Sequence, residues 1–250
     1  MQNGDYTIPW HEKEGRKRLF ESRYSKHFFE LAHRFQPQIK PTFCGVASAV
    51  MVLNALRIKT GLRIDSGLEV QVPVSHGGGA MAYNSYSQLT FLNTETDIIK
   101  PREWIEGVTV ECETSGDVIF EPSLNLEQLG AKLKLYLLSV QTRHAVIGEK
   151  DDLRSNPINR FRQDLMAYLN DSNTYIIVNY NGKSIGKKVN DHFSPVAAYH
   201  EESDSVLVMD VAGHKHPWFW VPVKDLFRAM ATKDGIDNRG YMLVSDKLRH

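Results

Sequence analysis

The sequence predicts an α+β fold in which helical segments precede an antiparallel sheet. Apolar residues recur at helical intervals early in the chain, whereas four β-rich segments occupy its last third. Helices followed by strands are typical of segregated helical and sheet layers. A length of 250 residues, 42% of them apolar, fits one large domain or two small lobes around a cleft. We expect a single domain over residues 1–250.

Each predicted element has a local cause. Regular apolar spacing favours helices, prolines at 37 and 41 interrupt the first of them, glycines favour a loop, and β-branched runs favour strands. The predicted elements are, in order, a helical stretch over 16–35, a buried helix beginning at or beside Cys44, a glycine-rich loop over 75–85, a helix running into a strand over 125–140, a helix over 158–170, and strands over 174–180, 192–200, 204–212 and 240–245.

Composition excludes several classes of partner. Thirty basic and thirty acidic residues cancel, which argues against nucleic acid and membrane surfaces. No apolar run approaches the roughly 20 residues that a bilayer span needs. The first 20 residues lack the apolar stretch of a secretory signal, so we expect a cytoplasmic protein if this start is native and an exported one if a signal was removed. Cys44 and Cys112 form neither a disulfide framework nor a zinc-ligand spacing.

Cys44 stands in front of a run, "GVASAVMVLNAL", that has almost no polar face. A helix that is apolar all round is buried within a domain. Pro41 lies just upstream, which places the start of this helix at or beside Cys44. The unpaired N–H groups and the positive dipole end there favour a thiolate. The alternative is that Cys44 is only a small buried hydrophobic residue.

His192 and Asp210 are the predicted partners of this thiol. The polar segment "HEESD" over 200–204 separates two β-rich runs, so a hairpin centred near Glu201 would place His192 directly opposite Asp210 on one face. A thiolate nucleophile needs such a histidine and its orienting group. The alternatives are that His192 is an exposed surface residue and that Asp210 only caps the end of a strand. Separately, His214 and His216 fall on one face of a strand and could hold a metal.

Three blocks of sequence carry a family resemblance. These are "RFQPQIKPTFCGVASAVMVLNAL", "VNDHFSPVAAYHEESDSVLVMDVAGHKHPWFWVPV" and "RGYMLVS". In order and approximate spacing they resemble the phytochelatin synthase family, within the papain-like cysteine peptidase superfamily. The resemblance implies a papain-like fold, with the nucleophile at the N-terminus of a central helix packed on an antiparallel sheet. Because the cysteine-rich C-terminal region of the plant enzymes is not present, the chain resembles the short bacterial type, in which hydrolysis tends to dominate.

The resemblance also implies a reaction and roles for residues. Such enzymes cleave glycine from glutathione through an acyl-enzyme, then pass γ-Glu-Cys to water or to a second glutathione, which yields phytochelatin. Cys44 matches the nucleophile, His192 the general base and acid, Asp210 the residue that orients the imidazole, and Gln38 the side-chain donor of the oxyanion hole. Cys112, flanked by two acids in "VECET", is expected not to be acylated.

Two further residues match the substrate-binding part of the family, and two depart from it. Arg239 resembles the arginine that holds the γ-glutamyl α-carboxylate, and Asp234 would face the α-ammonium. Asp191 stands where the family has glycine before the histidine, and Gly213 replaces the arginine of the family's "DV-x-R". These departures bear on the glycine-side pocket and on binding of the acceptor.

The resemblance implies glutathione and related γ-glutamyl thiols as partners, and it leaves a homodimer open. No cofactor is expected for acylation. Cadmium or zinc would act as activators or as thiolate complexes of the substrate, in keeping with metal detoxification. Two alternatives stay open: a relative that acts on glutathione S-conjugates or another γ-glutamyl peptide, and a non-catalytic module that binds thiols or metals.

Overall fold

The computed structural model describes residues 7–59, 69–73, 80–107, 122–147 and 156–246. Its helices are α1 (Lys13–Glu21), α2 (Lys26–His33), α3 (Cys44–Lys59), α4 (Gln88–Phe91), α5 (Thr94–Asp97), α6 (Arg102–Glu106), α7 (Leu126–Leu135), α8 (Pro157–Tyr168), α9 (Val223–Met230) and a 3₁₀ turn at Gly182–Ile185. Its strands are β1 (Ile8–Pro9), β2 (Glu69–Pro73), β3 (Ala80–Asn84), β4 (Leu138–His144), β5 (Thr174–Asn181), β6 (Asp191–His200), β7 (Ser205–Val208), β8 (Phe219–Pro222), β9 (Lys233–Asp234), β10 (Asp237–Asn238) and β11 (Gly240–Asp246).

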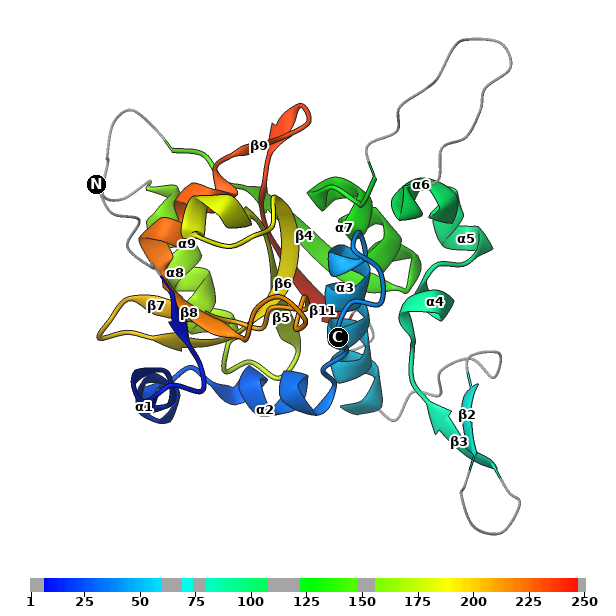
Figure 1. The fold of residues 1–250 in the computed structure, drawn as a ribbon, viewed down its shortest axis with the longest axis horizontal. Helices are drawn as coiled ribbons and strands as arrows, with labels where there is room; N and C mark the ends of the chain where they lie inside the picture. The colour runs from blue at the N-terminus through cyan, green and yellow to red at the C-terminus, as the bar shows by residue number, and fades with distance from the viewer. Residues whose placement is uncertain (1–6, 60–68, 74–79, 108–121, 148–155, 247–250) are drawn as a thin grey trace.

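An antiparallel sheet with the strand order β1-β8-β7-β6-β5-β11-β4 forms the centre of the fold, with helices on both faces (Figure 1). β5 shows why its run "TYIIVNY" is apolar without alternation. Ile177 packs in the core shared with α3 and α7, whereas Ile176 and Val178 pack in the core shared with α8 and α9. Because both faces of the strand are buried, both sets of side chains are apolar. The predicted α+β class is confirmed.

α3 is the central helix of the first core. Every residue from Cys44 to Arg57 is buried, as the almost wholly apolar sequence predicts. Gly45 allows close packing on β6, because a Cβ there would lie 3.3 Å from the Phe193 ring. The helix therefore brings its first residue against the start of β6. Among the ranges described above, no helix is both long and apolar enough to cross a membrane.

Three predicted elements differ from the structure. The helical stretch over 16–35 is two helices, because the chain between α1 and α2 makes a β-bridge in which Tyr199 N–H donates to Tyr24 O at 2.8 Å. Residues 80–84 of the predicted loop form β3, paired with β2, and residues 74–79 lie outside the described ranges. The strand predicted over 204–212 ends at Val208.

Candidate active site

Cys44 is the first residue of α3, as the sequence predicts. The chain turns immediately before it, where Phe43 N–H donates to Lys40 O at 3.1 Å. Gln38 N–H also donates to Val211 O at 2.9 Å, which ties this loop to the segment after β7. As the first helical residue, Cys44 contributes an N–H without an intrahelical partner. The thiol therefore lies at the positive end of a buried helix.

His192 and Asp210 form a buried pair beside this helix start. His192 Nε2 donates to Asp210 Oδ1 at 2.7 Å, and both side chains are almost completely buried. The same carboxylate oxygen accepts from Ala212 N–H at 2.8 Å, which fixes the carboxylate. Tyr180 packs edge-on against the His192 ring, with the ring centres 5.7 Å apart. The imidazole is thereby held in one orientation.

The electrostatics of this pair favour an imidazolium. Burial opposes protonation of His192, but hydrogen bonds with Asp210 and with Cys44 outweigh it and raise the pKa of His192 to about 10. Burial also opposes ionisation of Asp210, yet its bond with His192 leaves the pKa of that carboxyl below its usual value. A protonated imidazole between a carboxylate and a thiol suits an ion-paired nucleophile.

The contact between His192 and Asp210 is present, but its predicted register is wrong. β6 pairs His200 with Ser205 and Tyr199 with Val206, so the hairpin is centred between Glu202 and Ser203. Continued unbroken, that register would place His192 and Asp210 on opposite faces of the sheet.

A bulge restores the shared face. The register shifts between Val196 and Ala198, after which Val196 pairs with Val208 and Met209 N–H donates to Pro195 O at 3.0 Å. Asp210 then falls across from Ser194, on the face that also carries His192. The two side chains meet diagonally. The extra residue in β6 therefore decides whether this pair exists.

Cys44 and His192 open onto a cavity of about 620 Å³. The Cys44 Sγ atom lies 4.0 Å from the carbonyl oxygen of Asp191. The charged residues of the lining are of both signs, namely Lys100, Lys188, Lys215, Asp191 and Asp234. Such a wall can bind a small molecule that carries both carboxylate and ammonium groups. The sequence did not predict these lysines as site residues, because they come from three separate loops.

Gln38 lies at the same cavity but is turned into its own loop. Its Nε2 donates to Lys40 O and to Pro41 O, each at 2.9 Å, and the residue is buried. Both amide hydrogens are therefore directed at the turn that precedes α3. In this conformation Gln38 supports the loop that positions Cys44.

Arg239 reaches the site from the start of the segment leading into β11, and it carries an unexpected partner. Its guanidinium is buried and forms an ion pair with Asp191, the residue before His192. Asp234, in β9, accepts from Asn179 Nδ2 at 3.0 Å and lines the cavity. The sequence shows a carboxylate beside His192, and only the fold shows that it pairs with Arg239.

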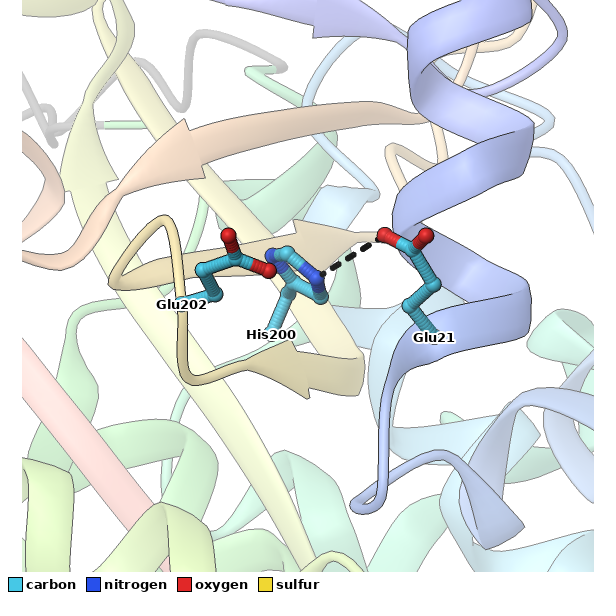
Figure 2. A group of neighbouring side chains, drawn as sticks. All are labelled: Glu21, His200 and Glu202. Carbon is cyan, nitrogen blue, oxygen red and sulfur yellow. Dashed lines mark ion pairs between the residues drawn. The ribbon is translucent and has the colours of Figure 1, made fainter.

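Other candidate residues lie apart from this constellation. Cys112 falls outside the described residues. His214 is exposed, and His216 accepts from Lys188 N–H at 3.3 Å. At the far end of β6, His200 stands between Glu21 and Glu202 (Figure 2). Its Nδ1 pairs with Ser203 Oγ at 2.8 Å and its Nε2 with Glu21 at 3.6 Å, so this group fastens α1 to the β6–β7 turn.

Comparison with known proteins adds a family to this geometry. The phytochelatin synthase family profile matches residues 4–241. Glutathione gamma-glutamylcysteinyltransferase 3 of Lotus japonicus is 28% identical over 244 residues, which are 96% of this chain and 42% of that protein. Glutathione gamma-glutamylcysteinyltransferase 1 of Triticum aestivum is 29% identical over 237 residues, which are 92% of this chain and 39% of that protein.

A more distant relative comes from a fungus. Glutathione gamma-glutamylcysteinyltransferase of Schizosaccharomyces pombe is 22% identical over 229 residues, which are 91% of this chain and 45% of that protein. The chain thus spans less than half the length of these relatives. Because the profile covers nearly all of the sequence, the chain belongs to the phytochelatin synthase family.

Proposed function

We propose that this chain is a thiol acyltransferase that removes glycine from glutathione and forms a γ-Glu-Cys thioester on Cys44. The observation that carries the proposal is the buried line Cys44–His192–Asp210, in which the imidazole is hydrogen-bonded on both sides and has a pKa of about 10. A binding module needs no charged nucleophile–base–orienter set at its cavity wall, so this arrangement favours catalysis.

In the acylation step the Cys44 thiolate attacks the carbonyl carbon of the Cys–Gly amide. The Cys44 backbone N–H at the start of α3 stabilises the resulting oxyanion. Gln38 would also stabilise the oxyanion if its Nε2 group gave up the hydrogen bond to one of the two loop carbonyls and donated to the oxyanion instead. Asp210 accepts the hydrogen bond from His192 Nε2. This leaves Nδ1 of the imidazolium to protonate the departing glycine amine as the C–N bond breaks.

In the second step the thioester is transferred. His192, now neutral, removes a proton from water or from the α-amine of a second glutathione. The acceptor then attacks the thioester carbonyl, and Cys44 leaves as the thiolate. Water yields γ-Glu-Cys, whereas glutathione yields the first phytochelatin. The resemblance implies an arginine of the family at the position of Gly213. Because its loss would weaken binding of the acceptor, we expect hydrolysis to dominate over transfer.

The cavity suits the proposed substrate. Glutathione carries two carboxylates and one ammonium, and the wall carries lysines together with Asp191 and Asp234. Complementary charge fixes the orientation of such a ligand. We further propose that the described helices and sheet form one catalytic domain of papain-like fold, with α3 as its central helix, and that heavy-metal ions enter as thiolate complexes of the substrate.

Mass spectrometry of the intact protein mixed with glutathione tests this function. A mass increase of one γ-glutamylcysteinyl group, together with free glycine, is expected for the parent and for Cys112→Ser. Cys44→Ala should show neither. Turnover of a glutathione S-conjugate or of another γ-glutamyl peptide, with no adduct from glutathione, would instead assign the site to that substrate. An absence of any adduct together with tight glutathione binding would make the chain a binding module.

A further inference from the structure

The ion pair between Asp191 and Arg239 places an acid between the cavity and a buried cation. Asp191 lines the cavity and its side chain is 46% exposed, whereas the Arg239 side chain is 6% exposed. Asp191 also lies beside the proposed nucleophile, because its carbonyl oxygen is 4.0 Å from Cys44 Sγ. Among the described residues, the cavity lining includes Asp191 and does not include Arg239, so the Asp191 carboxylate lies on the cavity side of this ion pair.

We propose that Asp191 is a built-in competitor for a carboxylate site on Arg239, which a substrate carboxylate must displace in order to bind. This inference rests on the proposed function in one respect, namely that the displacing group is the α-carboxylate of a γ-glutamyl substrate. Asp191 thereby sets the affinity and the selectivity of the site.

The two partners differ in how firmly they are held. Arg239 Nη1 donates to Thr232 Oγ1 at 2.9 Å and also to Lys233 O, so the guanidinium is fixed to the segment before it. Asp191 is half exposed and begins β6. A carboxylate with access to water is displaced more readily than a buried guanidinium, because leaving a charge buried without a partner is costly. Asp191 is thus the partner that moves.

The exchange has a chemical consequence for selectivity. A guanidinium can hold either carboxylate through the same pair of N–H donors. A substrate without a carboxylate at this end gains nothing by displacing Asp191, and it also meets the negative charge of the residue. Substrates that carry the α-carboxylate are therefore selected, but their binding is weakened by the competition with Asp191. Because the Asp191 side of the ion pair is half exposed, we expect the competition to raise the Kd for glutathione by about 10-fold.

Calorimetric titration of glutathione into the Cys44→Ala protein tests the proposal without turnover. Adding Asp191→Asn should lower the Kd for glutathione by about 10-fold, and Asp191→Gly offers a second variant should the first fold poorly. Asp237→Asn is the matched control, because it removes a negative charge from the neighbouring β10 and leaves the ion pair intact. For 4-aminobutyryl-Cys-Gly, which lacks the α-carboxylate, Asp191→Asn should not produce this 10-fold fall in Kd.

A third variant separates Arg239 from other effects of Asp191. In the Cys44→Ala/Arg239→Ala protein, Asp191→Asn should no longer tighten glutathione binding. An unchanged Kd in Asp191→Asn and Asp191→Gly, or an equal gain with and without Arg239, would overturn the inference even if Cys44 is acylated by glutathione. The converse result, tighter binding in the absence of any acyl-enzyme in the active protein, would support the carboxylate site and contradict the proposed function.

Discussion

Replacing Asp210 with asparagine tests the charge that holds His192 protonated. The variant keeps an oxygen that can accept from His192 Nε2 and from Ala212 N–H. Its amide nitrogen would occupy the position of Asp210 Oδ2, which is buried and without a hydrogen-bond partner among the described residues. A buried NH₂ group without an acceptor costs about 1–3 kcal/mol, so we expect a folded but less stable protein.

The size of the effect on His192 follows from the ion pair. The pKa of His192 rises to about 10 in spite of burial, and the bond with Asp210 is the largest favourable cause. A hydrogen bond to a charged group contributes about 1.5–3 kcal/mol, and each pH unit corresponds to about 1.4 kcal/mol. The midpoint of the His192 titration in Asp210→Asn should therefore fall by about one to two pH units.

The sign of the stability change follows from linkage. Because the folded pKa of His192 lies above its usual value of 6.5, protonation stabilises the native state fully below pH 6.5. That contribution is lost as the pH rises from 6.5 to about 10. In Asp210→Asn the same loss should be complete at a lower pH, so the difference in free energy of unfolding between the two proteins should shrink above pH 8.

Two measurements check this prediction. NMR titration of the His192 ring follows the midpoint, and urea unfolding at pH 6 and at pH 10 follows the linkage. In the proposed reaction kcat for glycine release should fall by about 10- to 150-fold, since the imidazolium loses its charged partner. A folded variant with an unmoved titration midpoint and an unchanged kcat would reduce Asp210 to a residue that ends a strand.

Three further substitutions and one product assay separate the roles of the other residues. Cys44→Ser should abolish the acyl-enzyme while leaving glutathione binding measurable by calorimetry; an adduct mapped to Cys112 would refute the assignment. Gln38→Ala should lower kcat by about 10²- to 10³-fold if the amide leaves its loop carbonyls for the oxyanion, whereas a lower Tm with normal kcat would assign it to the loop alone. Arg239→Ala should cut kcat/KM for glutathione by roughly 10- to 150-fold; an enzyme as fast as the parent would place γ-glutamyl recognition elsewhere. Product analysis at millimolar glutathione, with and without cadmium or zinc, should give glycine and γ-Glu-Cys with little polymer, and abundant polymer would mean that Gly213 does not impair the acceptor site.

Local sequence determined the elements on which the site is built. The apolar run after Cys44 dictates a buried helix, because no face of it could be left in water. Pro41 and the turn before Phe43 fix where that helix begins, and so place the thiol at its N-terminus. The run "TYIIVNY" likewise dictates a strand that is covered on both faces. These outcomes depend on residues close together in the chain.

Only the tertiary structure decided how the side chains meet. The hairpin after His200 has a register that separates His192 from Asp210, and the bulge between Val196 and Ala198 brings them onto one face. A single inserted residue reverses the side-chain alternation beyond it, and its position depends on packing against both neighbouring strands. Pro195 lies beside the bulge and is compatible with one, but the sequence pattern does not establish that a residue is inserted or where.

The local sequence could not identify the ion-pair partner of Arg239 either. Asp191 and Arg239 lie 48 residues apart and meet because β6 and the segment entering β11 both border β5. The sequence determined that a carboxylate stands beside His192. Which cation neutralises it, and whether that cation is covered from the cavity, depends on the order of strands in the sheet, because strand order alone brings these distant side chains within reach of each other.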